Sequence, residues 1–520
     1  MVVAYLYRCQ YLKSIEVFEK IRAEVGKLEN IPDYVILGAA QSYQEERMRS
    51  ESKELFKYIL KKEPKNATAL KGLYYCLLEQ EKHAQALEVA EQMRKASKEF
   101  VQYPDFRIVN PERLMEEETY STAFLYAEYL DDAQCFLENM IRIQPFNAST
   151  RKNLSNLYNT RGLSRAAERQ AHLGLEIDPE DLDLKISLAN SLISLQDYEK
   201  AEEIVDYLAK EYPESKAVQV LLRSWNAYNK REFDLAAGYD RNYGQIAFSG
   251  KREFYVDGKL YSQPILYNYR AFIGSRYAYT RFTEGTLNGY FSVVGMEYRG
   301  RGLDAAVGFN YNKFGGKKEG YFIRGSVNPT DHWAFAGNVD INSIDTPSRA
   351  FVNKITSNVY ELGGKYIHNE SMSVSVGGRN QQYTHHNVQN TVTARVFKRL
   401  FSNYDFKLDS AIDFSTTHSK KTNVPYYSPK RDYSPNIELA LNHRLWRDYE
   451  YSFRHILTVA YGRHWEKGYN TRWTGLVSYE HELNYIDWFY FKYGYARKRA
   501  SYDGAPEYTN MFYLKLNIKF

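Results

Sequence analysis

Acidic residues recur at alternate positions in the second half of the chain, each between apolar neighbours, as Glu438 lies between Ile437 and Leu439. Successive side chains of a β-strand point to opposite faces, so these carboxylates would share one face of their strands. With Phe520 on the other face, the set comprises Glu297, Asp304, Asp340, Asp409, Asp413, Glu438, Glu480 and Glu482, together with the phenol of Tyr513. Carboxylates on one face would favour a cationic ligand, and aromatic rings beside them are typical of a polysaccharide path, although any strand with its other face in lipid would also turn its charges inward.

The strands that must carry these side chains begin near Phe233. From there to the C-terminus, segments of roughly 9–13 residues alternate apolar and polar positions, and we find about 16 of them. Long connections, such as Arg499–Glu507 and Thr417–Tyr433, alternate with short ones, such as Asn484–Ile486. A soluble β-sandwich has no reason to alternate in this way, whereas a barrel with short turns at one end and long loops at the other does. We therefore predict an antiparallel transmembrane β-barrel over residues 232–520.

The first half of the chain repeats. Pro145, Pro179 and Pro213 are spaced by 34 residues, which is the period of tetratricopeptide (TPR) repeats, where a proline follows the second helix of each pair. A generic helical bundle is the alternative. The sequence predicts a TPR-like α-solenoid over residues 1–231, so the fold class is α plus membrane β. Because the first repeat lacks its first helix, we expect this chain to begin inside a longer array, without a signal sequence.

Composition excludes several classes of protein. The 520 residues carry a net charge of only +5, which is too weak a signal for nucleic-acid binding, and 48 tyrosines raise the aromatic share to 16%. No run of about 20 apolar residues exists, so no transmembrane helix is expected. Cys9, Cys76 and Cys135 offer neither a disulfide framework nor a metal-binding spacing, and no cofactor is indicated. The motifs of serine hydrolases, zinc proteases and P-loop enzymes do not occur, so we do not expect an enzyme.

Six short strings in the predicted barrel carry a resemblance to a known family. They are Glu297–Asp304, Asp331–Trp333, Asp345–Ala350, Tyr426–Asp432, Leu445–Glu450 and Tyr502–Gly504. In this order, and after a helical solenoid, they resemble the outer-membrane poly-β-1,6-N-acetylglucosamine (PNAG) export porins. The resemblance implies a barrel in the cell outer membrane that exports partly de-N-acetylated, and hence cationic, PNAG for the biofilm matrix. It also implies a periplasmic helical domain that recruits the PNAG deacetylase, the polymer or both.

Two of these strings fall in long connections, and the resemblance suggests that they gate the pore. The candidate gating residues are Asp345 and Arg349 in the first string and Tyr426, Tyr427, Lys430, Arg431 and Asp432 in the second. We expect an acidic lumen that attracts the amine-bearing polymer, an outer surface in contact with lipid, and no nucleic-acid partner. Two other functions stay open: export of another exopolysaccharide such as cellulose, and a membrane-anchored TPR scaffold.

Overall fold

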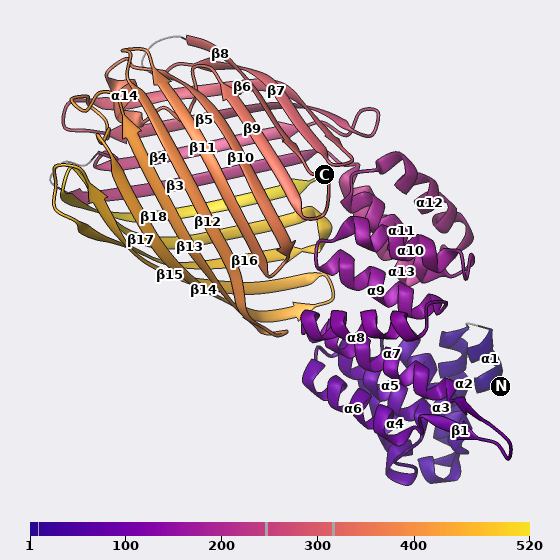
Figure 1. The fold of residues 1–520 in the computed structure, drawn as a ribbon. Coiled ribbons are helices and arrows are strands. Elements are labelled where there is room, and N and C mark those ends of the chain that lie inside the picture. Colours follow the sequence, from indigo (N-terminus) through magenta and orange to yellow (C-terminus); the bar gives the residue numbers. More distant parts are fainter. Residues whose placement is uncertain (9, 245–247, 315–317) are drawn as a thin grey trace. The chain divides into compact units, whose positions relative to one another are not determined.

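A computed structural model describes residues 1–8, 10–244, 248–314 and 318–520 (Figure 1), so Cys9 lies outside the described residues. The chain forms two compact units, Met1–Leu157 and Tyr158–Phe520. Helices give way to strands between α13 (Lys216–Tyr228) and β3 (Glu232–Gly244). The predicted division at residue 231 follows this change of secondary structure. The compact units divide earlier, because the helices after Leu157 contact the barrel.

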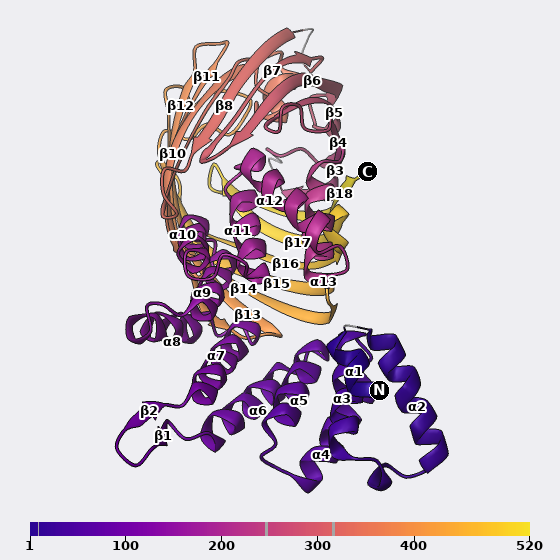
Figure 2. The same cartoon turned by 90° about the vertical axis from the view of Figure 1, so that its right-hand side faces the viewer.

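The first unit is a stack of helical hairpins (Figure 2). Small residues stand where paired helices approach closely, since Ser14, Ser52 and Ala86 have no exposed surface. A Cβ added to Gly72 would lie 2.1 Å from the ring of Phe56, so this contact also depends on a small residue. The elements are α1 (Val2–Tyr7), α2 (Tyr11–Val25), α3 (Asp33–Glu45), α4 (Arg49–Lys62), α5 (Ala67–Glu79), α6 (His83–Ala96), the hairpin β1 (Phe100–Gln102) and β2 (Arg107–Val109), α7 (Pro111–Tyr126), α8 (Leu130–Ile143) and α9 (Ala148–Thr160), the last of which runs into the second unit.

The second unit continues the helical repeat. Ala167 and Ala201 have no exposed surface, and Pro179 and Pro213 follow the second helix of their pairs. The TPR-like solenoid predicted from the 34-residue period is confirmed. Among the described residues, no helix combines the length and the hydropathy that a membrane crossing requires. The helices before the barrel are α10 (Ser164–Leu175), α11 (Leu182–Ser194), α12 (Tyr198–Glu211) and α13.

Within the described residues, 16 antiparallel strands close into a barrel, as predicted (Figure 1). Consecutive strands pair with one another, and the ring is completed where the first strand meets the last, with Phe233 opposite Ile518. The strands are β3, β4 (Arg252–Tyr261), β5 (Tyr269–Arg281), β6 (Thr286–Gly300), β7 (Leu303–Asn312), β8 (Lys318–Val327), β9 (Trp333–Asp340), β10 (Ser357–Asn369), β11 (Met372–Tyr383), β12 (Val388–Ser402), β13 (Phe406–Ser419), β14 (Asp432–Asp448), β15 (Tyr451–Glu466), β16 (Arg472–Tyr485), β17 (Phe489–Tyr502) and β18 (Ala505–Lys519).

The two faces of the barrel differ in chemistry. The apolar side chains of Leu362, Phe309 and Ile437 are 74%, 72% and 58% exposed, as expected of a surface that lipid covers. The residues at alternate positions are more polar and better buried, as the burial pattern of β14 shows. The hydrophobic face predicted from alternation therefore forms the outside of the barrel.

One predicted connection is wrong. The long loop predicted over Arg499–Glu507 is absent, because these residues continue β17 and β18 to a tight turn at Asp503 and Gly504. Both turn residues have positive φ, 49° and 72°. Arg499 is accommodated in the strand because its guanidinium stacks 3.6 Å from the ring centre of Trp473.

Candidate functional site: the barrel interior and its mouth

A cavity of about 1000 Å³ identifies the inner face of the strands. Side chains of neighbouring strands from β4 to β12 line it, among them Phe272, Arg324 and Thr393, and they can share one cavity only from the inside of a closed ring. Directly paired residues of antiparallel strands point to the same side, so the strand register identifies the inward-facing residues of every strand of the barrel. On this register the inner face carries Glu297, Asp304, Asp340, Asp409, Asp413, Glu438, Glu480, Glu482 and Tyr513. Their role in a polymer path stays a prediction.

The inward carboxylates have cationic partners. Arg395 binds Asp413 at 2.9 Å and Glu438 at 2.8 Å. Single ion pairs join Arg399 to Asp409 at 2.7 Å, Lys492 to Glu480 at 2.8 Å, Arg454 to Glu482, and Arg299 to Glu297 at 2.7 Å. The expectation of an acidic lining is therefore wrong, because the lining mixes both charges. Alternation assigns a carboxylate to a face, but it does not reveal which cation on the same or a neighbouring strand reaches it.

Two of the predicted lining residues have neutral partners. Asp304 accepts a hydrogen bond from Gln196, in the connection between α11 and α12, at 2.9 Å. Asp340 accepts a hydrogen bond from Ser343 at 2.6 Å, just beyond the end of β9. Asp304 thus lies at the helical end of the barrel, and Asp340 lies toward the opposite mouth.

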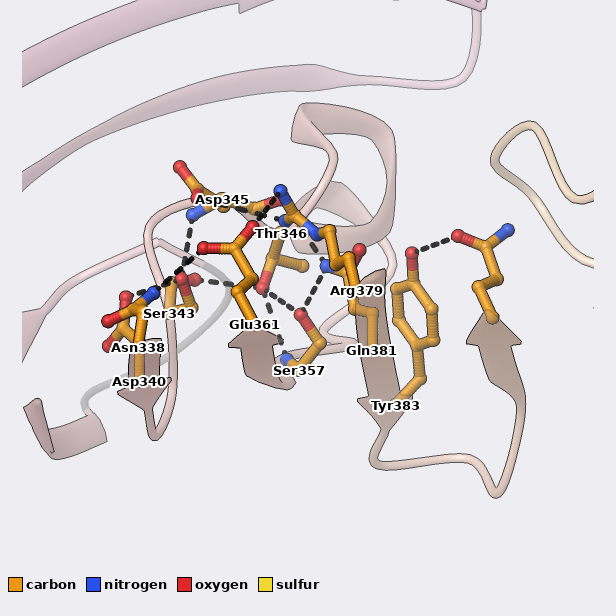
Figure 3. A network of polar contacts seen from close by, with 11 residues as sticks. Asn338, Asp340, Ser343, Asp345, Thr346, Ser357, Glu361, Arg379, Gln381 and Tyr383 are labelled. Carbon is orange, nitrogen blue, oxygen red and sulfur yellow. Dashed lines mark hydrogen bonds and ion pairs between the residues drawn. The ribbon is translucent and has the colours of Figure 1, made fainter. Parts of the chain in front are cut away.

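The first gating string follows β9 and lies against the inner face. Figure 3 shows Asp345 and Thr346 beside residues of β10 and β11. The hydroxyls of Thr346 and Ser357 are 2.7 Å apart. Arg379 binds Glu361 at 3.2 Å and lies 3.7 Å from the carboxylate of Asp345. The structure therefore ties this string to two strands through polar contacts.

The helix α14 (Ser348–Val352) turns the same segment into the barrel. Phe351 is 2% exposed, and its ring centre lies 5.4 Å from that of Phe314. Both rings share an apolar cluster with Phe291, which is an inner-face residue of β6. Burial of apolar area against the inner face holds this segment inside the mouth.

The second gating string is also well packed. Tyr426 is 2% exposed and stacks on Tyr383 of β11 with 4.4 Å between ring centres. The amide of Asn387 donates to the Tyr426 hydroxyl at 3.0 Å, and the Tyr427 hydroxyl donates to Asp432 at 2.9 Å. Burial raises the pKa of both phenols, so they remain neutral donors at physiological pH.

Phe248, which the sequence analysis did not single out, connects the two strings. Its ring centre lies 6.1 Å from that of Tyr427 and 5.8 Å from that of Tyr502, and the Arg349 guanidinium lies 5.4 Å from it. Arg349 also pairs with Glu284 in the β5–β6 loop. These residues lie at the ends of well-separated strands or in the connections between them, so their contacts extend across the mouth. A lone aromatic in a loop is too common a pattern to have indicated this role.

Two predicted gating residues lie outside this cluster. The side chains of Lys430 and Arg431 are exposed. Their carbonyl groups make the local contacts. The ring nitrogen of His418 lies 2.6 Å from the Lys430 carbonyl oxygen, and the N–H of Lys467 donates to the Arg431 carbonyl oxygen at 2.9 Å. Their backbone therefore shapes the segment, while their side chains face away from the packed cluster.

The other end of the barrel binds helices of the second unit. Arg301, in the β6–β7 turn, forms ion pairs with Glu168 of α10 at 2.6 Å and with Asp197 at 3.0 Å. Asp331, in the β8–β9 turn, accepts hydrogen bonds from the backbone N–H groups of Arg165 and Ala166 at 2.9 and 3.0 Å, so it caps the start of α10.

A third contact of this kind involves α13. Arg223 binds Glu450 at 2.9 Å and Asp487 at 3.0 Å, both in short turns of the barrel. Arg301, Asp331 and Glu450 belong to three of the strings that carry the family resemblance. These strings therefore attach the helices to the barrel, which is a role that their sequence alone did not indicate.

A closed β-barrel with an apolar outside, a charged inside and ordered loops over one mouth is an outer-membrane barrel. The model of the PgaA membrane beta barrel domain matches residues 228–520, and the chain belongs to that family.

The curated relatives extend the likeness into the helical region. The poly-beta-1,6-N-acetyl-D-glucosamine export proteins of Escherichia coli K12 and Escherichia coli O157:H7 are each 24% identical to the chain over 456 residues, which covers 87% of this chain and 56% of theirs. The chain thus spans about half the length of these relatives. A solved structure described as a bacterial polysaccharide outer membrane secretin shares the fold, with a TM-score of 0.51 and 22% identity over 56% of this chain and 99% of that chain.

Proposed function

We propose that the chain is an export porin for partly de-N-acetylated PNAG and that it works without catalysing a reaction. The inner face of the barrel carries the proposal, because it presents both ion pairs and the inward rings of Phe291, Phe322 and Tyr513. The free amines of the polymer are cationic and can exchange into carboxylate pairs, while sugar rings stack on aromatic faces. Family membership and the export activity named for the two relatives support the same class of polymer.

Transport requires binding that is weak and repeated. The side chains of the Arg395–Asp413 pair are 41% and 30% exposed. An ion pair at such exposure contributes only about 0–1 kcal/mol, so an ammonium group can replace the guanidinium at little cost and then move to the next pair. A lining of this kind would guide the polymer without trapping it.

The two gating strings would close the mouth when no polymer is moving. Support comes from Phe351 packed on the inner face, from Tyr426 stacked on Tyr383, and from Phe248 between Arg349 and Tyr427. These contacts are made by side chains. Displacing Phe248 would weaken the connection between the two strings, which also share a buried cluster of Ala350, Tyr383 and Tyr426.

The helical region would lie in the periplasm and recruit the PNAG deacetylase. The first unit contains a cavity of about 680 Å³, lined by Tyr7, Tyr11, Tyr75, Met93 and Met115 among others. Aromatic and methionine side chains in a concave surface suit a protein segment, because methionine adapts its shape to a partner and aromatic rings supply large contact areas. This groove is our candidate for the deacetylase-binding surface.

The test is a planar-bilayer recording on the full chain and on a variant with Phe248→Ala and Tyr427→Ala, in which the mouth should open. Partly de-N-acetylated β-1,6-glucosamine oligomers should block the open variant at lower concentrations than fully acetylated ones, because only the former carry ammonium groups that bind carboxylates. Asp413→Asn with Glu438→Gln should weaken the block, and Lys430→Ala should leave it unchanged. Equal block by cellulose oligomers would favour a cellulose exporter, and absence of conductance in the open variant would favour a scaffold.

A further inference from the structure

Four arginines form a row on the outer face of the barrel. Arg241 of β3 lies directly opposite Arg252 of β4, and Arg252 lies directly opposite Arg281 of β5. On the other side, Arg241 faces Asn510 of β18, which in turn faces Arg497 of β17. Five adjacent strands thus place four guanidinium groups on one line across the surface.

The register fixes the outward direction of this row. Asp257 and Lys259 of β4 line the inner cavity, so Arg252, at an alternate position, points outward. The side chains of Arg241, Arg252, Arg281 and Arg497 are all exposed. They form a continuous cationic strip on the surface that faces lipid.

No carboxylate of the described residues forms an ion pair with any of the four. The neighbouring outward positions at this level carry Tyr243, Tyr279, Tyr508 and Thr286 instead. This differs from the inside of the barrel, where Arg395, Arg399 and Arg454 each bind an acidic partner. Like charges directly opposite each other on neighbouring strands are destabilising, so a row of this kind requires an anion from outside the chain.

The position of the row indicates where that anion lies. Arg241 is close to the end of β3 that is farther from α13, while Arg252 begins β4 and Arg281 ends β5. Aromatic rings accompany the row: the Arg241 guanidinium lies 5.0 Å from the ring centre of Tyr243, and that of Arg497 lies 5.9 Å from Tyr508. Tyrosines on the outside of a barrel mark the level of the lipid headgroups.

We propose that Arg497, Arg241, Arg252 and Arg281 form a binding site for a phosphate-bearing lipid of the leaflet at this end of the barrel. A guanidinium binds a phosphate through two parallel hydrogen bonds, and a row of them suits a headgroup with more than one phosphate. The bound lipid neutralises the repulsion within the row and fixes the barrel at one depth in the membrane. This site is independent of the polymer path, because it lies on the opposite face of the strands.

The experiment uses the full chain in dodecylmaltoside micelles with bisphosphorylated lipid A as the probe. Bound lipid is quantified by mass spectrometry, and stabilisation is read from the temperature at which the barrel loses its heat-modifiable gel mobility. The variants are Arg241→Gln with Arg252→Gln, the charge-preserving Arg241→Lys with Arg252→Lys, and Lys498→Gln. Lys498 is the matched control, because it lies next to Arg497 on the opposite face of β17.

We expect the double glutamine variant to bind lipid A at least about tenfold more weakly than the unchanged chain, with the lysine variant in between and Lys498→Gln unaffected. Unchanged gel mobility at room temperature would show that each variant is folded. Equal binding by the glutamine variant, or equal binding of the same lipid after removal of its phosphates, would overturn the proposal. Stabilisation by inorganic phosphate as strong as that by the lipid would overturn the assignment to a lipid headgroup.

Discussion

The hydroxyl of Tyr513 donates a hydrogen bond to Glu480 at 2.6 Å, although the two residues lie on β18 and β16 with β17 between them. The residue between them is Gly494, which faces both in the register. A Cβ at this position would lie 2.9 Å from Glu480 Cγ and 2.9 Å from Tyr513 Oη. The glycine therefore leaves the space in which two predicted lining residues meet over an intervening strand.

We predict that Gly494→Ala separates this pair and destabilises the barrel by about 1.5–3 kcal/mol, which is the usual contribution of a hydrogen bond to a charged group. Urea unfolding in lipid vesicles would measure the change. Gly378→Ala is the matched control, because a Cβ at this strand glycine has no atom within 4 Å. A similar loss of stability in both variants would contradict the structural role that we give to Gly494.

Arg395 neutralises two inward carboxylates on its side of the barrel. Replacing it by glutamine would leave Asp413 and Glu438 without their shared cation. We expect Arg395→Gln to raise the preference of the pore for cations, because two carboxylates then act on the passing ions without a compensating charge. The reversal potential under a tenfold KCl gradient would measure this, and Arg431→Gln, whose side chain is exposed outside the cluster, should leave it unchanged.

The sequence predicted the faces of the strands better than their partners. The alternation around Glu438 identifies its inward side correctly, because a period of two is a local property of one strand. That Arg395 reaches Glu438 across β13 depends on the register of three strands, which no single segment encodes. The same limitation applies to Asp331, whose interaction with α10 joins residues 166 positions apart. Phe248 could not be predicted for the same reason, because its contacts with Arg349, Tyr427 and Tyr502 join segments that are far apart in the sequence.

The link through Phe248 can be tested separately from the lining. Phe248→Ala should remove its contacts with Tyr427, Tyr502 and Arg349 and so weaken the link between the two gating strings, which leaves the shared cluster of Ala350 and Tyr426 in place. We expect a higher open probability in single-channel recordings, with little change in the conductance of the open state. Lys430→Ala, on the exposed side of the second string, serves as the control. Unaltered gating in Phe248→Ala would contradict this link and leave the shared cluster of Ala350 and Tyr426 as the connection between the strings.

The turn between β17 and β18 should make closure depend on pH. Burial and the nearby Glu466 raise the pKa of Asp503 from 3.8 to about 6. Because the folded pKa lies above the unfolded one, the stabilising contribution of this group is complete below about pH 3.8 and is lost as the pH rises through about 6. Tyr502, adjacent to Asp503, contacts both Phe248 and Tyr427, so a less stable turn should weaken the closed mouth.

We expect more frequent opening at pH 7.5 than at pH 5, and Asp503→Asn should abolish the difference. A pH dependence that persists in this variant would assign it to another group.

The contacts at the helical end lead to a final prediction. Asp331 caps α10 by accepting two backbone hydrogen bonds, and loss of a helix cap typically costs about 1 kcal/mol. We expect Asp331→Ala to loosen the helices of the second unit from the barrel, which limited proteolysis would detect as faster cleavage near α10, while the barrel keeps its heat-modifiable mobility. Asp405→Ala is a suitable control, because this exposed aspartate lies in the short β12–β13 turn and contacts its neighbours through its backbone. If both variants resist protease as well as the unchanged chain does, the remaining contacts, among them the ion pairs of Arg301, Arg223 and Arg161, are sufficient to attach the helices. Combining Asp331→Ala with Arg301→Ala should then expose the cleavage sites, because that variant removes the contacts of two turns with α10.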